Sequence, residues 1–124
     1  QSAEDYLETI LMLNQRMGRV RSIDVVNELG YTKASVSIAM KKLRENGYIA
    51  VDGEGNLTLL EPGREIAERI YSRHRLLTHF FVQLGVDEEV AAEDACKAEH
   101  ILSEQTLEKI REYALLHDAQ DSVK

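Results

Sequence analysis

Two helix-forming patterns separated by a glycine constrain the fold of this chain more than any other feature. Apolar residues recur at helical spacing over residues 23–29 and again over residues 33–46, and neither run contains proline or glycine. Gly30 ends the first run, and Thr32 stands where the second run needs an N-cap. Two short helices joined by such a turn make a helix-turn-helix.

A predicted hairpin follows the second helix directly. Residues 47–51 and 57–60 are rich in apolar side chains, and residues 52–56 between them have the glycine, acidic and amide residues of a tight turn. A helix-turn-helix followed by a hairpin is the pattern of a winged helix, whose second helix enters the major groove of DNA. The sequence therefore predicts a mostly α-helical chain that begins with a winged helix-turn-helix.

The outward face of the second helix carries small hydroxyls near its start and cations, including Arg44, further along. This pattern suits base edges and phosphates, although a short amphipathic helix with a basic outer face is also common without that role. The residues expected to contact double-stranded DNA are Arg21, Thr32, Lys33, Ser35, Ser37, Lys41, Lys42 and Asn56.

Charge is distributed unevenly along the chain. The formal net charge is -7, but residues 14–50 hold seven basic and three acidic residues, a net charge of +4, which leaves -11 for the remainder. One basic segment in an acidic chain is expected when one part meets phosphate and the other binds cations or a second subunit.

Further helices are predicted on both sides of the winged helix. They cover residues 3–16, with Ser2 as N-cap, and residues 62–84, 87–102 and 104–116, while residues 118–124 are expected to form a frayed tail. Leu84 is expected in the buried set of its helix. The last two helices enclose too little volume for an independent core, so we expect them to pair with a second subunit in a two-fold homodimer.

Three metal-ligating residue types come together near the end of the helix expected over residues 87–102. Cys96, Glu99 and His100 are three and four residues apart, so they share one face of a helix that continues through them, and Asp87 is expected to cap that helix. A thiolate, a carboxylate and an imidazole are donors for a transition metal. The alternative is that the cysteine is a small buried side chain and the Glu-His pair a solvated surface.

Three more candidate ligands lie on other predicted helices. Asp5 and Glu8 are three residues apart in the first helix, and His74 lies midway along the helix over residues 62–84. Read singly, the acids complement a helix dipole and the histidine makes a polar contact between helices. Read together with the Cys-Glu-His group, they indicate a divalent metal site with donors from three helices.

Cysteine usage and hydropathy indicate the compartment. A single cysteine provides no intramolecular disulfide, which fits a reducing cytoplasm. No apolar run approaches the roughly 20 residues of a membrane span, and no signal peptide precedes the first acidic helix. We expect a cytoplasmic protein without membrane contact, and no enzyme, because no nucleophile or general base stands apart from the candidate ligands.

As an ordered set, these motifs resemble the diphtheria toxin repressor family of metal-dependent transcription regulators, which includes iron-dependent repressors and manganese transport regulators. The resemblance rests on residues 4–8, the winged helix, and residues 73–77, 84–87 and 95–103. It implies a winged helix DNA-binding domain over residues 1–62 and a helical metal-binding and dimerisation domain over residues 63–124. It also implies that bound metal spaces the two recognition helices of a homodimer to fit successive major grooves of an operator.

The resemblance also implies roles for the candidate ligands. Asp5, Glu8, His74, Glu99 and His100 match ligands of the manganese branch, whereas Cys96 matches the iron branch. A thiolate among carboxylates and imidazoles favours iron(II), with manganese(II) close behind, and zinc, cobalt or nickel can bind such a site in vitro. We therefore expect a repressor that answers Fe2+ or Mn2+ to control metal homeostasis genes. The alternatives are a winged-helix regulator that is not metal-responsive and an enzyme that uses the metal hydrolytically.

Overall fold

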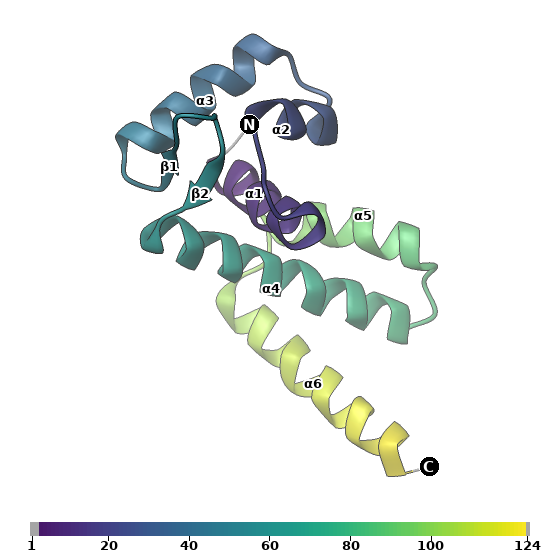
Figure 1. Cartoon of the computed structure of the whole chain (residues 1–124). Coiled ribbons are helices and arrows are strands. Elements are labelled where there is room, and N and C mark those ends of the chain that lie inside the picture. Colours follow the sequence, from purple (N-terminus) through teal and green to yellow (C-terminus); the bar gives the residue numbers. More distant parts are fainter. Residues whose placement is uncertain (1–2, 124) are drawn as a thin grey trace. The chain divides into compact units, whose positions relative to one another are not determined.

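The computed structural model describes residues 3–123 and the side chains of residues 3–118, so the expected N-cap Ser2 lies outside the described residues. The elements in chain order are α1 (Ala3–Met17), α2 (Ser22–Leu29), α3 (Lys33–Glu45), β1 (Ile49–Val51), β2 (Leu57–Leu59), α4 (Glu61–Gln83), α5 (Glu88–Ala98) and α6 (Glu104–Val123) (Figure 1). This part of the chain is mostly helical with a two-stranded sheet, as predicted.

The chain divides into two compact units, one ending at Ile70 and one beginning at Tyr71, so the division falls inside α4. The domain boundary expected at residue 62 stays a prediction. Among residues 3–123, no helix is both long and apolar enough to cross a membrane.

The first unit is a winged helix. Here α1 packs against α2, α3 and β2, and α2 packs against α3. Each helix buries the side chains that recur every three to four residues, because these share one face. The buried apolar side chains of these elements are Tyr6, Leu7, Ile10, Leu11, Leu13, Val25, Val36, Met40, Leu43, Ile49, Leu57 and Leu59.

The turn between α2 and α3 forms as the sequence predicts. Gly30 has a φ of 73°, in the left-handed region that favours glycine, and its N–H donates to Val26 O at 2.8 Å. Thr32 Oγ1 accepts the N–H of Ser35 at 3.1 Å, which caps the start of α3. A side-chain cap of this kind stabilises a helix by about 1 kcal/mol.

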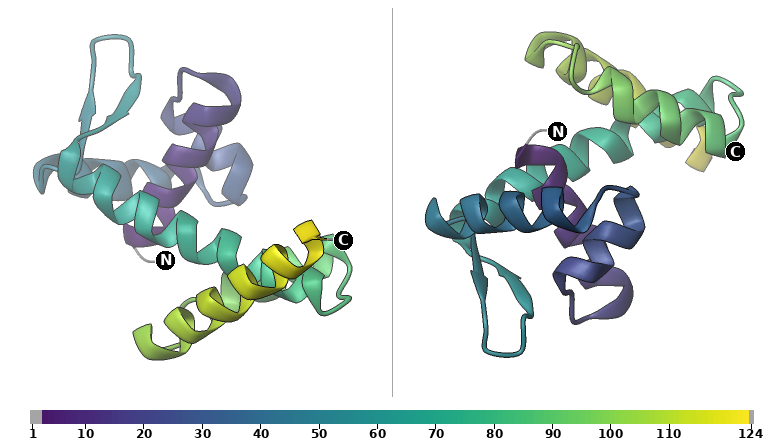
Figure 2. Two further views of the ribbon diagram at one scale, coloured as in Figure 1. Left: turned by 90° about the horizontal axis from the view of Figure 1, so that it is seen from below. Right: turned by 90° about the horizontal axis from the view of Figure 1, so that it is seen from above.

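The hairpin projects from the helices of its unit as a wing (Figure 2). Its strands pair antiparallel, with Ile49 opposite Leu59 and Val51 opposite Leu57. The segment between α1 and α2 joins the hairpin, because Leu57 N donates to Val20 O at 2.7 Å. This pairing ties the wing to the helix-turn-helix.

The turn of the wing is closed by one carboxylate. The backbone N–H groups of Glu54 and Asn56 each donate to Asp52 Oδ1 at 2.9 Å, and the Asn56 amide donates to Asp52 Oδ2 at 3.0 Å. These bonds, led by that from the Asn56 backbone, lower the pKa of Asp52.

The start of α4 lies against the residue that precedes β1. Leu60 N donates to Tyr48 O at 2.9 Å. A Cβ added to Gly63 would lie 2.2 Å from the same carbonyl oxygen. Since real side chains do not come this close to backbone oxygens, only glycine fits at this position.

The second unit consists of the later part of α4 with α5 and α6. α5 turns back along the later part of α4 (Figure 1), after a turn at Gly85, whose φ is 105°. Leu77, Ala95 and Leu107 each come from a different helix and form the buried core of this unit. The side chains packed around that core are Phe81, Ala98, Leu102 and Ile110.

Several expectations about the second unit are wrong. The helix expected over residues 87–102 ends at Ala98, where Ile101 N and Leu102 N both donate to Ala98 O and the last turn tightens. Asp87 is its N-cap residue, but the Asp87 side chain makes no capping hydrogen bond. Leu84, expected in the buried set, is 62% exposed and follows the last residue of α4.

The expected frayed tail is also wrong, because α6 continues to Val123. Asp118 explains part of this extension. Its carboxylate accepts the Gln83 amide at 2.8 Å and lies 3.0 Å from His79 Nε2, so the later part of α6 is tied to α4.

Candidate DNA-binding surface and metal centre

The outward face of α3 carries the polar side chains that the sequence assigns to DNA contact. Val36, Met40 and Leu43 face the core, with exposed fractions of 0%, 4% and 3%. The side of α3 opposite these three residues therefore faces solvent. The exposed polar residues of this surface are Thr32, Lys33, Ser35, Ser37, Lys41, Lys42 and Arg44.

A hollow of about 260 Å³ runs beside α3 toward the wing. Ser37, Lys41 and Arg44 follow one another on a single stripe of the helix and line this hollow, together with Ser22 at the start of α2. Two hydroxyls and two cations around one hollow are the groups that bind phosphate oxygens.

Arg21 and Asn56, the two remaining candidates for DNA contact, lie next to each other where the wing meets α2. They form an isolated antiparallel bridge. Arg21 N also donates to Asp24 Oδ2 at 2.9 Å, which fixes its backbone at the start of α2. The Asn56 side-chain amide donates a hydrogen bond to Asp52 within the wing turn. Arg21 is exposed and provides the positive charge at this place.

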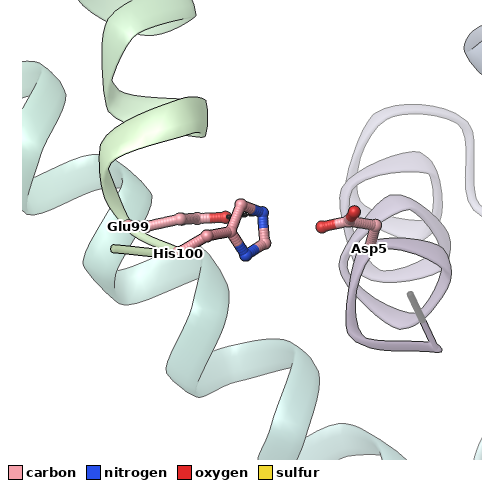
Figure 3. Close-up of side chains that lie close together, drawn as sticks. All are labelled: Asp5, Glu99 and His100. Carbon is pink, nitrogen blue, oxygen red and sulfur yellow. Dashed lines mark ion pairs between the residues drawn. The ribbon is translucent and has the colours of Figure 1, made fainter. Parts of the chain in front are cut away.

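Two candidate metal donors belong to the first turns of α1. Asp5 is half-buried and Glu8 is 6% exposed. The Asp5 carbonyl accepts the Thr9 hydroxyl at 2.8 Å. Figure 3 draws the Asp5 carboxylate on this helix, and the three-residue spacing to Glu8 places both acids on neighbouring turns.

The second unit holds three of the candidate donors, Glu99, His74 and His100. The Glu99 side chain is buried, and one of its carboxylate oxygens lies within 4.8 Å of a ring nitrogen of His74. His100 Nε2 lies 3.7 Å from Glu99 Oε1 (Figure 3). One buried carboxylate beside two imidazoles is a donor set that fits a divalent cation.

His74 is oriented by the backbone of α5. Its Nε2 lies 3.1 Å from Ala92 O, so Nε2 carries the proton and donates to this carbonyl. The lone pair of the ring is then on Nδ1. A histidine that ligates a metal usually has its other nitrogen bonded in this way. Sequence reasoning missed the Ala92 carbonyl, because a backbone oxygen leaves no signal in residue identity.

The helix expected to carry Cys96, Glu99 and His100 ends before the last two of them. Glu99 is the C-cap residue of α5, with its N–H donated to Ala95 O at 3.1 Å, and His100 lies in the turn that follows, so the helix does not continue through both residues as expected. Cys96 lies within α5 and is exposed. Among the described residues, the groups of three ligand atoms that lie within 4.8 Å of one another do not include Cys96.

Sequence reasoning also left out one exposed residue of α3. Ile38 lies in the middle of α3 and is 59% exposed. Its spacing from Val36 and Met40 places it outside the buried face of α3, and this spacing was the signal in the sequence that could have predicted its exposure.

Two family models match the chain. The iron dependent repressor N-terminal DNA binding domain matches residues 1–57, and the iron dependent repressor metal binding and dimerisation domain matches residues 60–116. A DNA-binding winged helix followed by these helices defines a metal-dependent transcription regulator. The chain belongs to the diphtheria toxin repressor family, whose members are regulators of transcription rather than enzymes.

Curated relatives are similar over most of the chain. It is 36% identical over 113 residues to an uncharacterised HTH-type transcriptional regulator of Methanocaldococcus jannaschii, covering 90% of both chains. It is 32% identical over 123 residues to the HTH-type transcriptional regulator MntR of Bacillus subtilis, covering 99% of this chain and 87% of MntR.

Solved structures share the fold. A manganese-dependent transcriptional repressor in complex with manganese has a TM-score of 0.82 and 28% identity, covering 91% of this chain and 52% of that one. The crystal structure of T. acidophilum IdeR has a TM-score of 0.83 and 24% identity, covering 91% and 54%. The chain thus spans about half the length of these solved chains.

Proposed function

We propose that this protein is a manganese(II)-responsive repressor that binds operator DNA as a homodimer in the cytoplasm. The observation that carries the proposal is the buried Glu99 carboxylate beside the His74 ring, whose other nitrogen is bonded to Ala92 O. A buried carboxylate is costly unless a positive charge compensates it. Such a pair is better suited to binding a cation than to a purely structural role.

The proposed ligands extend beyond the second unit. Glu99, His74 and His100 supply fewer donors than the six or so oxygen and nitrogen ligands typical of manganese(II). Asp5 and Glu8 provide two further carboxylates one helical turn apart. The family resemblance assigns these acids to the same site, so we propose that all five residues bind one cation or one cluster.

Manganese(II) is favoured over iron(II) by the donor types. The expectation of iron rested on the Cys96 thiolate, whereas the groups of three ligand atoms that lie within 4.8 Å of one another among the described residues consist of carboxylates and imidazoles. Carboxylates and imidazoles without a thiolate form a harder set, which suits manganese. Similarity to the B. subtilis regulator MntR and to the manganese-dependent repressor supports the same choice.

The charges of these residues give a reason for a metal response. Asp5, Glu8 and Glu99 would bring three negative charges to one place, and like charges repel. A bound divalent cation supplies the compensating positive charge. If the cation binds more tightly when the donors on α1 and in the second unit are in the arrangement that fits DNA, its binding favours that arrangement. Metal binding then shifts the population of the protein toward the DNA-binding state.

A DNA-binding titration tests the proposal. Duplexes enriched from a random library by the manganese-loaded protein serve as probes, and affinity is measured with Mn2+, with Fe2+ under anaerobic conditions, with Zn2+, and with chelator. We expect Mn2+ to raise affinity on the order of 5- to 150-fold, the usual range of such coupling. Equal affinity with Mn2+ and chelator would leave a winged-helix regulator that is not metal-responsive.

Matched variants locate the site. Glu99→Gln keeps the shape of the side chain but removes its charge, so it should abolish the response to Mn2+ and leave chelator-treated binding unchanged. Glu93→Gln makes the same change at an exposed position of α5 and should respond like the unmodified protein. An unchanged response in Glu99→Gln would remove this residue from the proposed site.

Cys96 remains a candidate sixth ligand, and Cys96→Ser tests it separately. If the thiolate binds metal, the variant should lose response to Fe2+ and Zn2+ more than to Mn2+, because sulfur favours the softer ions. Identical responses to all three ions would leave the oxygen and nitrogen donors as the full set.

A further inference from the structure

Ile38 stands out on the surface of α3. Its side chain is 59% exposed, whereas the other large apolar residues of this helix, Val36, Met40 and Leu43, are at most 4% exposed. Single exposed apolar residues are common on proteins and need no explanation by themselves. The position of this one, at the middle of the helix that faces DNA in the proposed function, is what carries an inference.

The surroundings of Ile38 are polar or small. Residues three and four positions away share its face of the helix, and these are Ala34, Ser35, Lys41 and Lys42, all exposed. The face thus has an apolar centre made of two aliphatic side chains, with a hydroxyl and two cations around it. Cations around an apolar centre complement a groove whose edges are phosphates and whose floor is made of bases.

Ile38 lies off the stripe that is suited to phosphate. Ser37, Lys41 and Arg44 line the hollow beside α3, and Ile38 is not part of its lining. Successive residues of a helix are 100° apart, so Ile38 faces a different direction from Ser37. When that stripe contacts the phosphate backbone, the adjacent one can face the base edges.

The chemistry of the side chain selects its target. Isoleucine has no hydrogen-bonding group, so it cannot read the donors and acceptors of the major groove. The apolar group exposed there is the C5-methyl of thymine. We propose that Ile38, assisted by the Ala34 methyl, contacts a thymine methyl in each half-site and so makes the protein prefer thymine at that position. This inference rests on the proposed DNA-binding function.

Replacement of thymine by deoxyuridine tests the contact directly. Deoxyuridine keeps base pairing and removes only the C5-methyl, and the scan uses the unmodified, manganese-loaded protein on duplexes enriched from a random library. Each thymine of the selected half-site is replaced in turn. Burial of one methyl group predicts about a fourfold loss of affinity at the position that Ile38 reads.

Two variants assign the effect to Ile38. For Ile38→Ala, the ratio of the affinity for the thymine duplex to the affinity for the uracil duplex should fall close to one at that position. At positions read by other residues, this affinity ratio should stay as it is in the unmodified protein. Ile23→Ala removes the same atoms from an exposed isoleucine of α2, which is 43% exposed, and should keep the ratio of the unmodified protein. Unchanged ratios in Ile38→Ala, or equal loss in both variants, would overturn the assignment.

The outcomes separate this inference from the function beneath it. A protein that enriches no duplex with any metal would overturn both. A protein that binds its selected duplexes tightly but tolerates uracil at every position within twofold keeps its proposed function and loses only the thymine contact.

Discussion

The two units reach their functional surfaces by different routes. In the first unit, neighbours in sequence set the geometry: Gly30 ends α2, Thr32 caps α3, and the spacing of apolar residues decides which side of α3 faces outward. In the second unit, Glu99 and His74 are distant in sequence and meet through the packing of α4 and α5. A DNA-facing helix can be encoded locally, whereas a donor group depends on tertiary structure.

The units also differ in how they bury apolar surface. The core of the first unit draws on all its helices and both strands, whereas that of the second is centred on Leu77, Ala95 and Leu107. Several large apolar side chains of the second unit are exposed, among them Ile101, at 82%, and Leu115 and Leu116, at 63% each. Exposed apolar surface on the part matched to a dimerisation domain fits contact with a second subunit.

The largest expected effect is therefore at the small core of the second unit. Leu77→Ala removes a fully buried side chain that α5 and α6 pack around, and such a change costs about 2–5 kcal/mol. Urea denaturation of the full chain measures the loss. Leu84→Ala, at a position 62% exposed on the unpaired chain, serves as the control. A loss under about 1 kcal/mol in Leu77→Ala would show that this unit does not depend on that core.

The next effect belongs to the first unit. Ala normally stabilises a helix relative to Gly by about 1 kcal/mol, but a Cβ at Gly63 would lie 2.2 Å from Tyr48 O. Since a backbone oxygen cannot move aside without shifting β1 or α4, we expect Gly63→Ala to destabilise by about 1–3 kcal/mol. Thermal denaturation compares it with Gly53→Ala, where a Cβ meets no atom within 4 Å. Greater stability in Gly63→Ala would contradict the close approach.

These differences explain how much could be predicted from the sequence. The winged helix was predictable because its signals are short-range: periodicity, a glycine with positive φ and a hydroxyl cap. The end of α5 was not, because the run through residue 102 contains no helix breaker. The tightened turn at Ala98 comes instead from packing, since Ala98 and Leu102 both contact the core of that unit.

The candidate ligands show the same limit. Residue types and spacing singled out Glu99, His100 and His74, although α5 ends before the first two of them. Neither the burial of Glu99 nor the bond from His74 to Ala92 O could be read from residue types. Residue chemistry is visible in a sequence, whereas burial and backbone partners are not.

A smaller effect compares the same local device in both units. Thr32 Oγ1 accepts Ser35 N–H at 3.1 Å, and Ser103 Oγ accepts Thr106 N–H at 3.2 Å. Replacing either residue by alanine should lower the free energy of unfolding by about 1 kcal/mol, whereas Thr32→Ser should preserve it, because serine caps a helix at least as well as threonine. Only the change at Thr32 should also weaken DNA binding, because that cap positions α3. Equal effects on DNA binding at both caps would mean that the cap acts through stability alone.

The smallest expected effect concerns the wing. Bonds led by the Asn56 backbone N–H lower the pKa of Asp52, so ionised Asp52 favours the folded state. Its contribution is fully present above the unfolded pKa of about 3.9 and is lost as pH falls through the folded value.

The difference in melting temperature between the unmodified protein and Asp52→Ala should therefore be largest near neutral pH and shrink below about pH 4. Glu54→Ala removes a charge from the same exposed turn, but the Glu54 carboxylate accepts none of these bonds, so its effect at each pH serves as the reference for the loss of a wing charge. If the Asp52→Ala difference persists undiminished at low pH, the carboxylate bonds do not hold the wing, and the local account of the first unit fails at this turn.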